Sequence, residues 1–163
     1  MTKTYRNGPV GALMDEYERA SLELKALIRT LSQDDFSRIV DTDTEDEDCR
    51  SVQTIMNHVV RAAYGYANYI RKQFGDNWLD SKEQYKLTTV EIACTELDQA
   101  LEYTVETLQH KWELTFEEMT SNEMKVSWGQ VYDFEQLLEH AIVHILRHRR
   151  QIERFKLRMS HAS

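Results

Sequence analysis

Apolar residues recur at the three- and four-residue spacing of α-helices in four stretches of the chain. The first stretch begins at Asn7-Gly8-Pro9, where the proline is pre-set for a first helical turn, and it continues to Leu31. The second lies between Ser51, which is suited to cap a helix, and Gly75, which is suited to end one. We therefore expect two amphipathic helices in the first half of the chain.

The second half shows the same spacing twice. Thr88 and Glu91 form the Thr-x-x-Glu pattern of a capping box, and the apolar stripe that follows continues to Leu108. Asp133 is spaced to cap the last helix together with Gln136. With four amphipathic helices of about 20 residues each, the pattern predicts an all-α four-helix bundle.

The segments between the helices differ in character. Ser32 opens "SQDDF", which predicts one short helical turn, and the acidic run "DTDTEDEDCR" follows it as a solvated loop. The connections near residues 32–50 and 76–87 are longer than a simple helical hairpin needs. Residues 112–131 are less regular, and their weak alternation favours a short extended segment or hairpin there.

Composition narrows the class of protein. One proline and five glycines among 163 residues are too few turn formers for a β-sandwich or barrel, and the length suits one domain over residues 1–163. No apolar run is long enough for a membrane span, and the first residues lack a secretory segment, so we expect a cytoplasmic protein without a membrane partner. The net charge of −8 argues against a nucleic-acid partner, and the basic segment "RHRRQIERFKLR" suits a helix C-terminus.

The histidines are unevenly distributed. His140, His144 and His148 follow one another at four-residue spacing in the last helix, although the chain has only six histidines. On a helical projection, His144 and His148 share the inward sector with Leu137, whereas His140 lies further toward the polar side. A buried neutral imidazole needs partners for both ring nitrogens, and one divalent cation satisfies the bare nitrogens of two stacked histidines.

A third ligand has to come from another helix. His58 is the only histidine inside another apolar helix, and it lies at the flank of that helix's apolar stripe. His110 and His161 are expected to be solvated. The spacing leaves open both a metal site and ordinary polar side chains at a helix surface, and three imidazoles suit zinc, nickel, iron or manganese. Cys94 is interpreted as core and Cys49 as a free thiol, so no disulfide framework is expected.

These residues give the chain a family resemblance. "SVQTIMNHVV" in the second helix, together with "HILRHRRQI" in the last, resembles the DinB/YfiT-like family of metal-binding bundles. The matching positions are His58, His144 and His148, with Arg149 and Gln151 following; His140 lies outside this three-ligand pattern. Arg150 stands where the family motif often has glycine. The resemblance implies an up-down-down-up bundle, a homodimer, and a divalent ion, zinc or nickel ahead of iron or manganese.

The resemblance also implies a range of activities. Some members transfer a low-molecular-weight thiol such as bacillithiol or mycothiol to an electrophile, and others resemble metal-dependent hydrolases. We therefore expect a small-molecule substrate, with a metal-activated water or thiol as nucleophile. The alternatives are a non-catalytic bundle that binds a metal or ligand and a bundle that docks a protein partner. Tyr66 is interpreted mainly as core, and Glu139 is the carboxylate nearest in sequence for hydrolysis.

Overall fold

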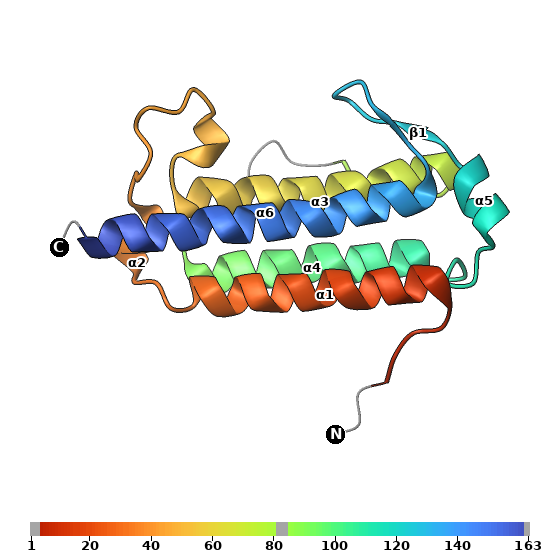
Figure 1. The fold of residues 1–163 in the computed structure, drawn as a ribbon, viewed down its shortest axis with the longest axis horizontal. Coiled ribbons are helices and arrows are strands. Elements are labelled where there is room, and N and C mark those ends of the chain that lie inside the picture. The colour runs from red at the N-terminus through yellow and green to blue at the C-terminus, as the bar shows by residue number, and fades with distance from the viewer. Residues whose placement is uncertain (1–3, 81–84, 162–163) are drawn as a thin grey trace.

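The computed structural model describes residues 4–80 and 85–161 and is dominated by four long helices (Figure 1). These are α1 (Gly8–Ile28), α3 (Val52–Phe74), α4 (Val90–Leu108) and α6 (Phe134–His161). Helices α1 and α6 run in one direction along the bundle, and α3 and α4 run in the other (Figure 1). Helix α3 packs against α4 and α6, and α1 packs against the same two helices. The structure thus confirms the predicted all-α bundle and its up-down-down-up order.

The helix directions explain the two long connections. Because α3 and α4 are parallel, the chain has to return along the bundle between them, which a tight turn cannot do. Residues 81–84 of this connection lie outside the described residues. The connection from α1 to α3 contains a short helix, α2 (Gln33–Ser37), and a 3₁₀ turn, η1 (Glu47–Cys49). The side chain of Ser32 accepts a hydrogen bond from the amide of Asp35, which confirms the predicted cap.

The ends of α3 and α6 follow the sequence signals. Ser51 and Thr54 form a reciprocal capping box at the start of α3, and Gly75 ends the helix in the left-handed conformation with φ of 73°. Asp133 and Gln136 bond each other's amides at the start of α6. These caps set both ends of α3 and the first turn of α6, the two helices that carry the histidines.

Two predicted boundaries were wrong. Helix α4 is capped by Thr89, whose hydroxyl accepts from the amide of Ile92 at 3.2 Å, and the Thr88–Glu91 capping box does not form. The amide of Thr88 instead bonds the carbonyl of Lys86 at 3.0 Å, so the helix begins one residue later. Helix α1 ends at Ile28, and Leu31 packs against the core from the segment that follows.

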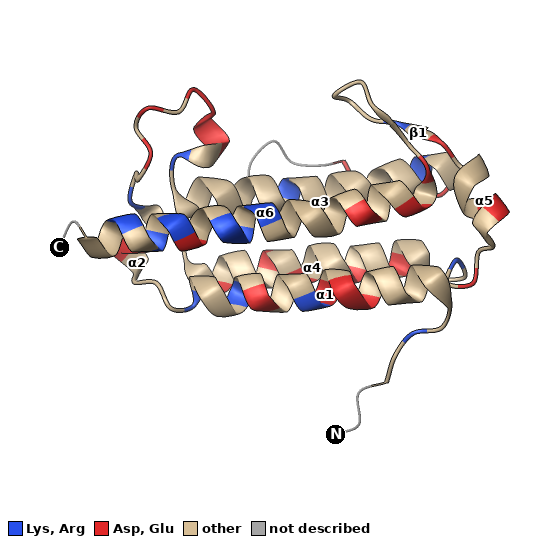
Figure 2. Ribbon diagram, in the orientation of Figure 1, with Lys and Arg blue, Asp and Glu red and all other residues tan. Residues whose placement is uncertain are grey.

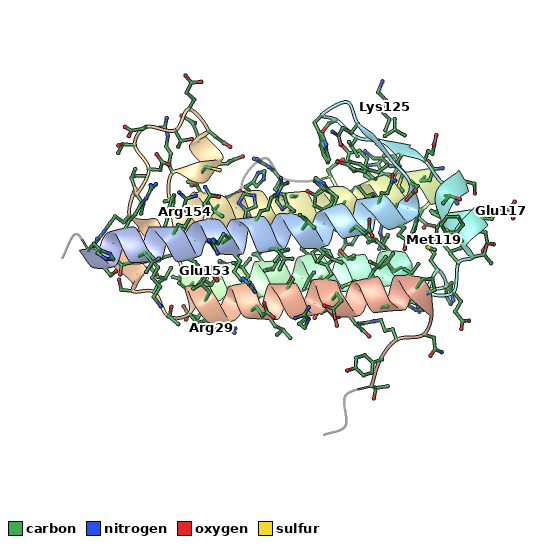
Figure 3. All side chains as sticks on the ribbon, viewed as in Figure 1. Arg29, Glu117, Met119, Lys125, Glu153 and Arg154 are labelled. Atoms are coloured by element: carbon green, nitrogen blue, oxygen red, sulfur yellow. The ribbon has the colours of Figure 1, made fainter. Side chains whose placement is uncertain are left out.

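The segment between α4 and α6 contains more structure than the sequence predicted. The expected hairpin is present as β1 (Met124–Lys125) and β2 (Val131–Tyr132), which pair antiparallel. A short helix, α5 (Phe116–Ser121), precedes it and was not predicted. Its Met119 is buried and points back toward the bundle, whereas Glu117 points outward (Figure 3). The segment therefore closes one end of the bundle and carries the hairpin over α3.

The core lies between the four long helices, and the predicted apolar stripes supply it. Buried side chains include Met14 and Leu24 of α1, Ile55 of α3, Leu97 of α4 and Phe134 of α6. Burial of each such side chain stabilises the fold by about 1.5–3 kcal/mol. Cys94 is buried among them as expected, and Cys49 is a half-buried free thiol. None of the helices in the described part of the chain is long and apolar enough to cross a membrane.

Charged residues cover the outside of the bundle. Lysine and arginine gather on the C-terminal half of α6, and acidic residues gather in the loop before α3 (Figure 2). The basic half of α6 pairs with acidic groups of the same chain: Arg149 contacts Glu23, and Arg158 lies 4.0 Å from Asp41. These ion pairs give the basic segment a structural role within the bundle.

Candidate metal centre

Three histidines from two neighbouring helices meet in the groove between α3 and α6. His58 lies in the second turn of α3, and His144 and His148 lie one turn apart on α6. One ligand nitrogen from each lies within 4.8 Å of the other two. The Nε2 atoms of His58 and His144 are 2.9 Å apart. The structure thus brings together the three residues that the sequence indicated.

The packing of α6 explains why these rings face the groove. His144 is only 6% exposed, and its neighbours Ala141 and Ile145 on the helix are buried in the core. His148 and His58 are half-buried at the edge of the same contact. The ring centroids of His144 and His148 are 4.5 Å apart, and that of His58 lies 4.8 Å and 4.9 Å from them. The triad is therefore a compact cluster at the α3–α6 interface.

Hydrogen-bonding groups occupy the outer nitrogens of two of the rings. The Nδ1 atom of His58 lies 3.3 Å from a carboxylate oxygen of Asp48, and the Nδ1 atom of His148 lies 3.0 Å from the amide oxygen of Gln151. Because an amide oxygen accepts hydrogen bonds, the contact with Gln151 places the ring proton of His148 on Nδ1 and leaves its Nε2 bare. The Nδ1 atom of His58 has a second neighbour, a guanidinium nitrogen of Arg61 at 3.4 Å. The Nε2 atoms of His58 and His144 lie close enough for a proton in a hydrogen bond, or a cation, to be shared between them.

The electrostatic surroundings keep the rings neutral. Burial, followed by the nearby His148 and His58, lowers the pKa of His144 to about 2. Burial and His58 lower the pKa of His148 to about 4. Burial also lowers the pKa of His58, although the carboxylate of Asp48 acts in the opposite direction. At neutral pH all three rings are uncharged, which is the form that binds a metal, so the donor set fits a divalent ion.

The acidic loop takes part in the site, which sequence reasoning missed. The turn η1 places Asp48 beside His58, and the guanidinium of Arg61 also contacts the Asp48 carboxylate. Asp46 caps η1 by accepting from the amide of Asp48 at 3.0 Å. Cys49, in the same turn, has its sulfur 3.9 Å from the amide oxygen of Gln151. Because the loop has no helical period, its spacing gave no sign of which carboxylate would face the triad.

The triad opens into a cavity of about 710 Å³ between the acidic loop and the hairpin. Apart from the three histidines, the lining residues are Asp46, Arg61, Ala62, Gly65, Tyr66, Tyr69, Ser127, Trp128, His140, Arg147 and Gln151. A volume of this size accommodates a small molecule. The site is therefore a cluster of three neutral imidazole rings at the wall of a cavity large enough for a small molecule.

The remaining candidates from the sequence have clear positions. His140 lies outside the triad: its ring stacks on Trp128, with centroids 5.6 Å apart. Tyr66 is 5% exposed, so it is part of the core as expected, yet it also lines the cavity. Glu139 is exposed and does not line the cavity. His110 and His161 are exposed, as predicted.

Comparison with known proteins agrees with the residues described above. The model of the DinB family matches residues 2–155, which is nearly the whole chain. A search of curated proteins found no match. The family match covers α1, α3 and α4 completely and α6 as far as Phe155, so it includes all three histidines of the triad.

Proposed function

Because the chain belongs to the DinB family, we propose that it binds a divalent metal and transfers a small thiol to an electrophile. His58, His144 and His148 would hold the ion through ring nitrogens, with zinc or nickel favoured over iron or manganese. When bound by three neutral imidazoles, such an ion would supply an open position and would lower the pKa of a thiol or water there. The observation that carries this proposal is the convergence of three histidines at a cavity wall, with one ligand nitrogen of each within 4.8 Å of the other two.

A thiol nucleophile would need little from the protein beyond the three histidines. In the transfer, the S–H proton goes to solvent, the sulfur forms a bond to the electrophilic carbon, and the leaving group departs with its electron pair. A thiol that is already ionised needs no general base. Asp48 is engaged by His58 and Arg61, which leaves Asp46 as the carboxylate that lines the cavity among the described residues.

A second candidate is hydrolysis, which Asp46 favours. Water needs a base to remove its proton during attack, and a carboxylate at the cavity wall is suited to that role. Asp46 replaces Glu139 as the candidate base, since Glu139 does not line the cavity. A bundle that binds a metal or ligand without turnover is the third alternative. Self-association as a homodimer also stays a proposal, which light scattering tests.

Metal analysis and turnover assays test the proposal in sequence. Metal content is measured by mass spectrometry on untagged wild type, on His144→Ala and on His161→Ala, a matched loss of an exposed histidine. We expect the metal to be lost only from His144→Ala. Equal metal content in all three proteins would refute the site. With metal bound, we expect conjugation of cysteine, coenzyme A or bacillithiol to 1-chloro-2,4-dinitrobenzene. Absence of turnover with every thiol would favour the binding bundle, unless ester hydrolysis is found.

A further inference from the structure

Gly65 is a glycine in the interior of α3 that has no packing reason to be glycine. It lies in the middle of the helix, and among residues 4–80 and 85–161 a Cβ atom placed on it meets no heavy atom within 4 Å outside the neighbouring backbone. Its backbone is ordinary helix, so no strained turn requires it. Glycine is unfavourable inside a helix compared with alanine. Gly65 lines the cavity beside the triad, so the missing side chain leaves space open there.

Trp128 forms a wall of the same cavity and is held in place by rings from two helices. His140 of α6 stacks against the indole at 28° between the ring planes. Tyr66 and Tyr69 of α3 contact it edge-on, with centroids 6.3 Å and 6.2 Å away. In spite of these contacts, Trp128 is 47% exposed. A fixed but accessible indole at a cavity wall is suited to contact a ligand ring.

The wall is fixed before any ligand arrives. The amide of Ser127 donates a hydrogen bond to the hydroxyl of Tyr69 at 2.7 Å, which fastens the hairpin to α3. On the other side, the hydroxyl of Tyr132 lies 3.3 Å from the Nδ1 atom of His140. A preformed wall loses little conformational freedom on binding, so its contacts contribute more fully to affinity.

We propose that the part of the cavity bounded by Gly65, Tyr69 and Trp128 is a subsite for a planar aromatic ring of the substrate. The ring lies against the indole and over the open backbone of Gly65. The triad is adjacent, because the ring of Tyr66 contacts both Trp128 and His144, with centroids 6.3 Å and 5.7 Å away. The proposal rests on the proposed function in one respect: it assigns the aromatic group to the molecule that reacts at the triad.

Calorimetric titration with two matched probes tests the subsite in the metal-loaded protein. The probes are 2-naphthoate and decahydro-2-naphthoate, which share a bicyclic frame and a carboxylate and differ in planarity. We expect wild type to bind 2-naphthoate about fivefold more tightly than the saturated probe. We expect Trp128→Ala and Gly65→Leu each to weaken 2-naphthoate binding about tenfold. The first removes the indole that the ring contacts, and the second places a side chain in the space above Gly65 that the ring would occupy.

Trp78→Ala is the matched control, since Trp78 is 50% exposed and does not line the cavity. We expect it to bind 2-naphthoate like wild type. Equal affinity for the two probes, no binding of 2-naphthoate, or equal effects of Trp128→Ala and Trp78→Ala would each overturn the subsite. Metal content of the same samples separates the two proposals. Lost ring preference with metal retained rejects only the subsite, and ring binding without any metal uptake rejects only the metal-dependent function.

Discussion

Replacement of Asp48 by alanine tests whether the acidic loop supports the metal site. Asp48 is the carboxylate that faces the outer nitrogen of His58, at 3.3 Å, and it also pairs with Arg61. Such a partner fixes the tautomer and the direction of a ligating ring. Alanine removes that acceptor and leaves the three histidines in place. We therefore expect Asp48→Ala to fold and to bind metal more weakly.

The geometry sets the size of the effect. Loss of a hydrogen-bonding partner behind a ligating histidine costs about 10- to 100-fold in metal affinity, or about 1.4–2.7 kcal/mol. The 3.3 Å separation is long for a charge-assisted bond, the side chain of Asp48 is 35% exposed, and Arg61 competes for it. These features place the loss for Asp48→Ala near the lower end, at about tenfold. Asp48→Asn keeps an acceptor oxygen and is expected to lose less.

Competition with a chromophoric zinc chelator measures this affinity on metal-stripped protein at pH 7. Glu45→Gln is the control, because Glu45 is exposed in the same loop and its loss changes the net charge by the same amount. We expect Glu45→Gln to bind zinc like wild type. If both variants lost the same affinity, the effect would be one of overall loop charge. If Asp48→Ala bound zinc as tightly as wild type, the orienting role would be refuted.

Three further predictions concern stability. The pKa values of His144 and His148, about 2 and about 4, lie below the ordinary 6.5. Below pH 6.5 these two histidines therefore become protonated in the unfolded chain while they stay neutral in the folded chain. Stability of the metal-stripped protein should therefore fall from about pH 6.5 to pH 5, by up to about 1.4 kcal/mol per pH unit for each histidine. Urea titrations check this, and an equal slope in the His144→Gln/His148→Gln variant would contradict it. Gly65→Ala should stabilise the protein by about 1 kcal/mol in urea unfolding, since the new Cβ meets open space; a loss of stability would show that the helix needs glycine there. Thr89→Ala should lower the free energy of unfolding by about 1 kcal/mol, and Thr88→Ala should leave it almost unchanged. The reverse order in thermal unfolding would show that Thr88 caps α4.

The long helices could be predicted from sequence because their signals are local and repeated. An apolar stripe places several residues on one face, so a single irregular position changes little. Caps are less secure, since Thr88 and Thr89 are both suitable and the choice depends on the turn before them. Helix α5 was missed because it is only six residues long, although Thr115 and Glu118 form a capping box at its start.

The candidate site likewise contains some residues that could be predicted from sequence and others that could not. The histidines lie on helices with a fixed period, so His58, His144 and His148 could be placed on facing sides before the fold was known. Asp48 and Trp128 come from a loop and a hairpin, and their approach to the site depends on contacts between segments distant in sequence. No local pattern records such contacts. Glu139 is the opposite case, since it is close to the histidines in sequence but is exposed and does not line the cavity.

The order of segments along the chain has a consequence for how this protein can diversify. The turn η1 comes directly before α3 and the hairpin directly before α6, so each wall of the cavity leads into a helix that carries part of the triad. Both are surface segments, where insertions and substitutions are tolerated best. Evolution or a designer can therefore exchange either one, and alter which molecules enter, while the helical frame and its imidazoles are inherited unchanged.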